Sequence, residues 1–249
     1  MLPRLCDHNR RSVRDRLGLY FEDQMRWLEA LGVAHSVAKI ESEAGAKQNA
    51  KTLSTHIELL KLPVLIFFHS KGGIDTLEML VSRPDLRDRV AGWIAVQSPF
   101  MGSPIADLYL QSSFYRGLFG TLLGLMGGSL DSLTALSSPV RLDYYQSHAT
   151  EIARVTEQMP FVAFMSWQDD NWPWEGDTPL EPYRDFMLEK MDLKNDGLVP
   201  VVSAGIPGCD LVVIANVDHR STVLSRPFVG FNRARFAESL FTMLRRRQF

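Results

Sequence analysis

The sequence PVLIFFHSKGG at residues 63–73 constrains the fold of this chain more than any other stretch. Its apolar run from Val64 to Phe68 predicts a buried strand, and a polar turn and two glycines follow at once. Apolar residues then recur at helical spacing as far as Val81. The stretch therefore predicts a strand, a tight turn with Ser70 at its apex and a helix, an arrangement that pushes the serine hydroxyl out of the regular backbone.

This turn departs at one position from the G-x-S-x-G pattern that is usual for a nucleophilic serine. Phe68 stands two residues before Ser70, where the pattern has a glycine. A bulky side chain at that crowded position favours an ordinary strand-to-helix turn with a surface serine. These five residues by themselves leave both interpretations open.

Composition favours a single α/β domain spanning residues 1–249. A chain of this length can bury one large core, and its 45% hydrophobic and 22% charged residues are ordinary for a globular protein. The net charge of −2 gives no basic footprint for nucleic acid. The sequence has no apolar run long enough for a membrane span, and its arginine-rich N-terminus lacks the apolar segment of a secretory signal. Cys6 and Cys209 form no metal-binding pattern and fit a reducing compartment, so a cytoplasmic location is expected.

Helical and strand patterns alternate along the chain. Helices are expected over residues 21–31, 43–60 and 71–83, and strands over 33–40, 64–68 and 90–96. Later strands are expected at 161–166 and 211–215, with helices at 142–159 and 231–244. The alternation predicts right-handed βαβ units, and hence a three-layer α/β fold in which helices cover both faces of a mainly parallel sheet.

Residues 104–150 are expected to form a helical cap inserted between two strands. The segment 105–126 is apolar and aromatic, with four glycines near its end. Glycine-punctuated apolar segments between strands often act as lids over a pocket, although another layer of core is the alternative. The candidate pocket residues for an apolar group are Phe100, Phe114, Phe119 and Leu122.

A nucleophilic serine needs a base, usually a histidine that a carboxylate orients. In sheets of this kind the three groups lie on loops at the carboxyl ends of different strands, in the chain order serine, acid, histidine. His219 comes directly after the last predicted strand, where it can act as the base for Ser70. The alternative is a loop histidine with no special role.

Several aspartates compete as the acid. Asp169 and Asp170 follow the predicted strand at 161–166 most directly. Asp196 lies in an Asn-Asp-Gly sequence that is a turn signal in its own right. Asp218 is a poor candidate, because a carboxylate rarely reaches the imidazole of the next residue in a loop.

Four segments together resemble the lipase and esterase branch of the α/β-hydrolase fold in bacteria. They are HSKGG at 69–73, QSPFMGSPIAD at 97–107, NDGLVPVVSA at 195–204 and DH at 218–219. The resemblance extends from about Tyr20 to the C-terminus. Its most specific part is the pairing of NDGLVP with DH, which is familiar from bacterial triacylglycerol lipases and favours Asp196 as the acid.

The resemblance implies hydrolysis of small-molecule carboxylic esters through an acyl-serine intermediate. We expect no cofactor and no catalytic metal. His219 would take the proton from Ser70 and later pass it to the leaving alcohol, while Asp196 would hold the imidazole tautomer. The backbone N–H of Lys71 would donate to the oxyanion.

The second oxyanion donor is where the sequence departs from the family. There it comes from a loop after an early strand, but residues 1–19 contain no apolar strand and no glycine except Gly18. We therefore expect a sheet with an incomplete N-terminal edge. Loss of one oxyanion donor lowers the rate by about a hundred- to a thousand-fold.

Three functions are compatible with these features. The first is hydrolysis of lipid-like or short acyl esters. The second is a catalytically weak or inactive hydrolase-like protein that binds an apolar ligand or partner, which Phe68 and the incomplete edge favour. The third is thioester hydrolysis or acyl transfer, which uses the same three residues and cannot be separated by sequence.

Overall fold

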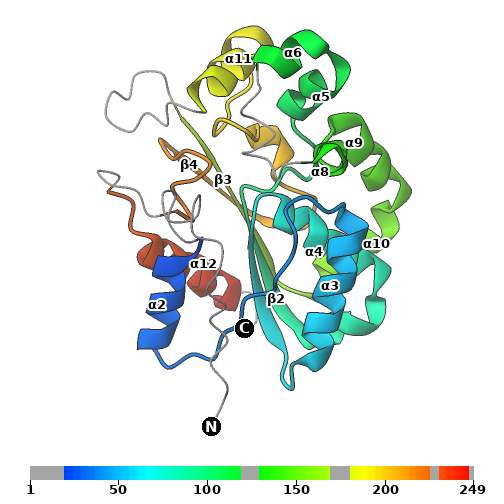
Figure 1. The fold of residues 1–249 in the computed structure, drawn as a ribbon. Helices are drawn as coiled ribbons and strands as arrows, with labels where there is room; N and C mark the ends of the chain where they lie inside the picture. The colour runs from blue at the N-terminus through cyan, green and yellow to red at the C-terminus, as the bar shows by residue number, and fades with distance from the viewer. Residues whose placement is uncertain (1–19, 119–128, 169–179, 225–229, 247–249) are drawn as a thin grey trace, which may run out of the picture.

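A parallel four-stranded sheet forms the centre of the molecule. A computed structural model describes residues 20–118, 129–168, 180–224 and 230–246 (Figure 1). Within these ranges the strand order is β1-β2-β3-β4, and every neighbouring pair is parallel. The strands are β1 (Val64–His69), β2 (Val90–Val96), β3 (Phe161–Trp167) and β4 (Asp210–Ala215). The predicted α/β class and parallel sheet are confirmed.

Helices cover both faces of this sheet, which gives the predicted three layers (Figure 1). One layer contains α3 (Ala46–Leu59), α4 (Lys71–Ser82) and α10 (Ala149–Gln158). The other contains α2 (Glu22–Ala30) and α12 (Arg233–Arg246). Short 3-10 helices, η1 (Pro84–Arg89) and η2 (Val201–Ser203), precede β2 and β4.

Alternation along the strands distributes side chains between two cores. Trp93 and Phe161 are register partners and point toward α3, α4 and α10, where their rings stack at a centroid distance of 4.1 Å. Ile94 and Val162, one residue further on, are also partners and point toward Phe236 of α12. Successive strand residues face opposite sides, so both faces need apolar cover, and the near-continuous apolar runs of β2 and β3 follow from that.

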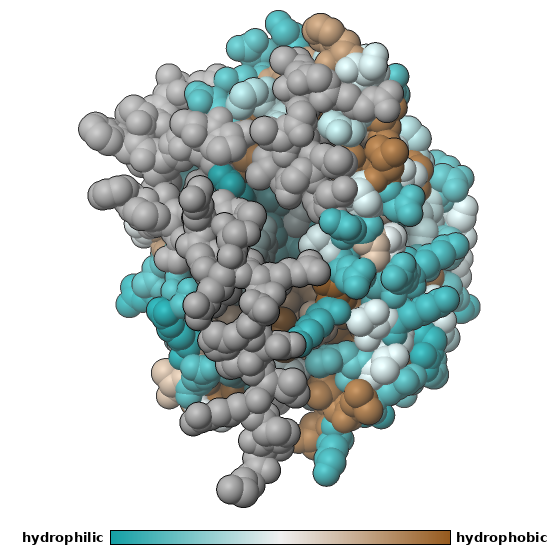
Figure 2. All heavy atoms as spheres, viewed as in Figure 1, coloured by the Kyte–Doolittle hydropathy of each residue, from teal (hydrophilic) through white to brown (hydrophobic). Residues whose placement is uncertain are grey.

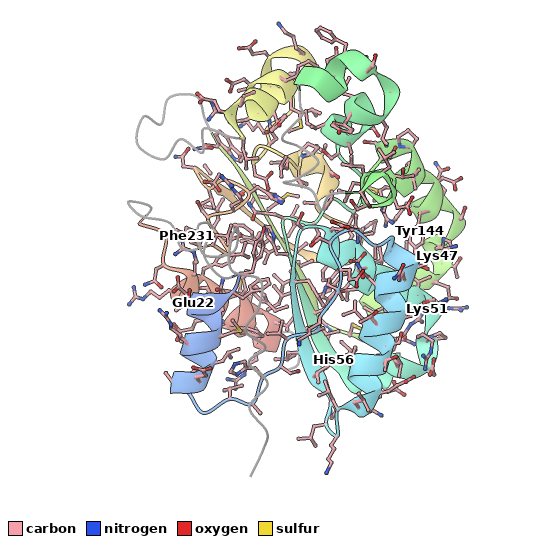
Figure 3. The ribbon with its side chains drawn as sticks, viewed as in Figure 1. Glu22, Lys47, Lys51, His56, Tyr144 and Phe231 are labelled. Carbon is pink, nitrogen blue, oxygen red and sulfur yellow. The ribbon has the colours of Figure 1, made fainter. Side chains whose placement is uncertain are left out.

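Helix α3 illustrates how the outer layer is amphipathic. Ala50, Leu53 and Ile57 lie in the core. Lys47 and Lys51 are exposed on the other side of the same helix (Figure 3). The 3.6-residue period thus places the charged residues in solvent and the apolar ones against the sheet.

The segment expected to form a cap is helical in its described parts. It contains α5 (Pro104–Gln111), α6 (Ser113–Leu118), α8 (Leu130–Ala135) and α9 (Ser138–Ser147), and α11 (Glu181–Met191) lies beside α5 and α6 above the sheet (Figure 1). A separate apolar cluster joins α5, α8 and α11 through residues such as Ile105, Leu133 and Met187. The single-domain organisation and the role of residues 104–150 as a cap stay predictions.

Two expectations about local structure were wrong. Residues 33–40 form no strand, because their side chains are largely exposed and the described part of the chain offers them no neighbouring strand. The helix expected over 142–159 is two helices, α9 and α10, which meet at His148 in a non-helical conformation (φ −118°, ψ 16°).

Within the described ranges, β1 is an edge strand of the sheet, and no earlier strand pairs with it. An incomplete N-terminal edge is therefore confirmed there, while residues 1–19 lie outside the description. Among the described residues, no helix is both long and apolar enough to cross a bilayer.

The stacked pair at the centre of the sheet leads to a first prediction. Trp93 is fully buried, and its indole N–H has no hydrogen-bond partner among the described residues. Trp93→Ala should lower the free energy of unfolding by about 3–5 kcal/mol, because it leaves a large cavity. Trp93→Phe should lose much less, since it keeps the stack on Phe161 and removes the unpaired donor. Urea unfolding followed by far-ultraviolet circular dichroism measures both, and equal losses would contradict the role of the stack.

Candidate active site

Ser70 connects β1 to α4 in a backbone conformation that L-residues rarely adopt. Its φ is 54° and its ψ is −130°. Two hydrogen bonds hold this turn, from Ser70 N to Val96 O (2.8 Å) and from Gly73 N to Ser70 O (3.0 Å). Strained residues of this kind persist only where the surroundings hold them. The strand-turn-helix expected around Ser70 is therefore present, with the serine at the first turn of α4.

The phenylalanine in the motif is accommodated by the glycine that follows the serine. A Cβ added to Gly72 would lie 2.6 Å from Cδ1 of Phe68. A Cβ added to Gly73 would overlap the Ser98 hydroxyl on the loop after β2. The crowding that made Phe68 an objection is thus relieved because residue 72 has no side chain, while the glycine at residue 73 leaves room for Ser98.

Three side chains from separate loops form a continuous hydrogen-bonded chain. His219 Nε2 lies 3.0 Å from Ser70 Oγ, and His219 Nδ1 lies 2.8 Å from Asp196 Oδ2. His219 and Asp196 are both buried. Because an ionised carboxylate only accepts, the assigned tautomer carries its proton on Nδ1, which leaves Nε2 free to accept from the serine hydroxyl.

The loop that carries Asp196 orients its carboxylate. Oδ1 accepts hydrogen bonds from the backbone N–H groups of Leu198 (3.0 Å) and Val199 (2.8 Å), so Oδ2 remains for the imidazole. Asn195 Oδ1 accepts from Gly197 N (2.8 Å), and Gly197 has a φ of 101°. The Asn-Asp-Gly turn signal and the position of the acid are therefore two aspects of one loop.

Of the three aspartates that compete with Asp196 as the acid, the structure describes one, Asp218. Asp218 accepts from Arg220 N (2.7 Å), Ser221 N (2.8 Å) and Ser221 Oγ (2.8 Å), so its carboxylate caps its own loop. Asp169 and Asp170 lie outside the described residues.

Lys71 follows Ser70 as the first residue of α4, where backbone N–H groups have no acceptor within the helix. Its ammonium contacts both carboxylate oxygens of Asp75 (2.9 and 3.0 Å), and Asn49 Nδ2 donates to the same carboxylate (2.8 Å). Burial raises the pKa of Asp75, and the charge of Lys71 opposes that shift. The side chain of Lys71 is thus bonded to Asp75, and the group that Lys71 could present to an oxyanion is its backbone N–H. Any second donor in residues 1–19 lies outside the description.

Two of the four candidate pocket residues, Phe100 and Phe114, lie in the described part of the chain. Phe100 was wrongly expected in a pocket, because its ring packs edge-on against Trp93 and Phe161 in the core and is only 1% exposed. Phe114 is 71% exposed on α6, and Phe119 and Leu122 lie outside the described residues.

His69 is a contributor that the sequence pattern did not reveal. It is buried beside the serine, and its Nε2 lies 2.7 Å from the backbone oxygen of His219. The two imidazole rings are 4.6 Å apart. Because a carbonyl only accepts, Nε2 must carry the proton. Burial lowers the pKa of His69 well below its usual value, and the charge of His219 lowers it further, so His69 is neutral at pH 7.

No family model matches this sequence, and a search of curated proteins found no match. Solved structures do resemble it. A metagenomic carboxyl esterase superposes with a TM-score of 0.75 and 25% identity, over 93% of this chain and 71% of the esterase. The chain has an α/β-hydrolase fold of the esterase and lipase type. The mature Bacillus licheniformis lipase shares this hydrolase fold, with a TM-score of 0.70 and 17% identity over 89% of this chain and 83% of the lipase. Lipase 1 from Pelosinus fermentans is more distant, with a TM-score of 0.51 and 12% identity over 90% and 91% of the two chains.

The contact between Phe68 and Gly72 in this hydrolase fold can be tested by exchange. Gly72→Ala should lower the free energy of unfolding by about 1–3 kcal/mol, because the added methyl group overlaps the phenylalanine ring. Phe68→Gly in the same chain removes the overlap and restores the first glycine of the motif. The double variant should therefore be more stable than the sum of the two single changes predicts, by about 1 kcal/mol in urea unfolding. Strict additivity would contradict the contact.

The lowered pKa of His69 predicts an acid-sensitive fold. In the unfolded chain this histidine takes up a proton near pH 6.5, whereas the folded protein resists protonation to a lower pH. Stability is therefore lost as the pH falls below about 6.5, by up to about 1.4 kcal/mol per pH unit from this residue. His69→Gln keeps a donor for the His219 carbonyl and cannot titrate. Its free energy of unfolding should fall less between pH 7 and pH 5 than that of the parent, and parallel profiles would refute the assignment.

Proposed function

We propose that this chain hydrolyses carboxylic esters through an acyl-enzyme on Ser70. The observation that carries the proposal is the chain of hydrogen bonds from Ser70 through His219 to Asp196, which begins at a strained turn at the start of α4. Similarity to a carboxyl esterase and to lipases supports ester hydrolysis as the class of activity.

The geometry favours the following acylation step. Ser70 Oγ attacks the ester carbonyl carbon as its proton moves to His219 Nε2, 3.0 Å away. Asp196 stabilises the imidazolium through Nδ1, and the Lys71 N–H donates to the oxyanion. The C–O bond to the alcohol then breaks, and the Nε2 proton goes to the leaving oxygen.

Deacylation uses the same atoms in reverse roles. A water molecule attacks the acyl carbon and gives a proton to His219 Nε2. The bond from the acyl carbon to Ser70 Oγ breaks, and Nε2 returns the proton to the serine. The products are a carboxylic acid and the free enzyme.

The substrate class rests on the apolar surface of the proposed cap. Hydrophobic surface gathers at the upper right of Figure 2, over the helices of residues 104–150. The exposed apolar residues of that segment include Phe114, Leu130, Val140 and Leu142. Such a surface favours an ester with an acyl chain that is lipid-like or short and apolar.

Two alternative functions would use the same site. A catalytically weak protein that binds an apolar ligand is favoured by the sheet edge at β1, beside which the family's second oxyanion donor arises. Thioester hydrolysis or acyl transfer would use the same three residues. Comparing esters with thioesters, and water with added alcohols as acceptors, separates these from ester hydrolysis.

A fluorophosphonate probe tests the proposal directly. It should label Ser70, and Ser70→Ala should abolish labelling and lower turnover of p-nitrophenyl butyrate by about 10⁴-fold or more. Ser98→Ala is the matched control, because this nearby hydroxyl is buried without a hydrogen-bond partner among the described residues, and its activity should be retained. A folded protein that the probe leaves unlabelled would refute ester hydrolysis by Ser70.

A further inference from the structure

Gln97 occupies an unusual position directly after β2. It is fully buried and has a positive φ of 51°. Its N–H donates to Phe164 O of β3 (2.7 Å), which extends the sheet hydrogen bonding by one residue before the chain turns away. A buried non-glycine residue with this backbone conformation is held there by its surroundings, and such residues concentrate at functional sites.

The side-chain amide of Gln97 is fully engaged. Nε2 donates to Ser166 Oγ at the end of β3 (2.6 Å) and to the backbone oxygen of Asp218 (3.0 Å). Oε1 accepts from Thr222 Oγ1 (2.8 Å). Because the Asp218 carbonyl can only accept, the amide nitrogen must face it, so the orientation of the amide follows from its partners.

These contacts lie on both sides of His219 in the chain. Asp218 precedes the histidine and Thr222 follows it by three residues, so one buried amide bonds the loop at both points. His219 itself is bonded through its N–H to Asp196 O (2.9 Å) and through its carbonyl oxygen to His69. The backbone around the imidazole is thus attached to the ends of β1, β2 and β3.

We infer that Gln97 is a positioning residue that holds the His219 loop so that Nε2 stays within hydrogen-bond reach of Ser70. The inference rests on the proposed function, in which His219 is the base. It adds a residue that touches neither Ser70 Oγ nor the His219 imidazole and acts through the Asp218 carbonyl and the Thr222 hydroxyl. A displacement of about 1 Å at a catalytic group can lower a rate by about a hundred-fold, which sets the scale of the expected effect.

The test compares Gln97→Met, which keeps the length of the side chain and removes its hydrogen bonds, with the parent enzyme. The variant should lower kcat for p-nitrophenyl butyrate by about 10- to 100-fold with KM changed less than two-fold, and fluorophosphonate labelling should slow in parallel. Thr222→Val should give a smaller loss, whereas Thr222→Ser should retain activity because it keeps the hydroxyl. The Gln97→Met and Thr222→Val pair should be non-additive, since both remove one shared hydrogen bond.

Nuclear magnetic resonance of the His219 ring tests the same inference without turnover. In the parent protein the Nδ1–H shared with Asp196 should give a low-field proton signal, and in Gln97→Met that signal should broaden or shift. A folded variant with unchanged kcat, unchanged labelling and an unchanged signal would overturn the positioning role, even if its melting temperature fell. Failure of the parent enzyme to be labelled would instead refute the proposed function, while the proton signal would still report on Gln97.

Discussion

The strained backbone at Ser70 is the constraint on which the rest of the site depends. A positive φ at a non-glycine residue is unfavourable by about 1–3 kcal/mol, so the fold must hold it. Val96 O on β2 accepts from Ser70 N, and the close approach of the chain to itself excludes side chains at Gly72 and Gly73. Phe68 then fills the space that a more usual motif leaves to its first glycine. The residues of the motif therefore pack against one another, and the missing side chain at Gly72 leaves room for the bulky one at Phe68.

Parallel strand pairing brings the other two groups to this turn. The carboxyl ends of β1, β2, β3 and β4 lie at one edge of the sheet, where ligand sites of open α/β sheets form. Ser70 follows β1 directly, and His219 follows β4 closely in the chain. Asp196 reaches the same place on a loop whose own backbone N–H groups orient its carboxylate. Buried polar side chains such as His69 and Gln97 then join these loops, and their hydrogen bonds make them acceptable inside a core.

The likeness to esterases and lipases agrees with this arrangement at the level of the fold. It covers 89% to 93% of this chain, with identities of 25% and below. Three features of this chain are local. The motif has Phe68 where a glycine is usual, a buried pair joins Lys71 to Asp75 in the first turn of α4, and β1 is the outermost strand of the described sheet. These features leave the α/β architecture unchanged.

The sequence by itself determined the α/β class and the positions of the four main strands along the chain, because apolar periodicity and turn residues are local signals. The same signals made Ser70 and His219 candidates. The sequence could not separate Asp196 from its rivals without the family resemblance, since a hydrogen bond between residues far apart in the chain has no local signal. Only the tertiary structure decided that Phe100 packs in the core, that residues 33–40 form no strand and that Gly72 accommodates Phe68. It also revealed His69 and Gln97, whose side chains bond to residues 69 to 150 positions away in the chain. Each of these depends on which surfaces meet after folding, and that is a property of packing.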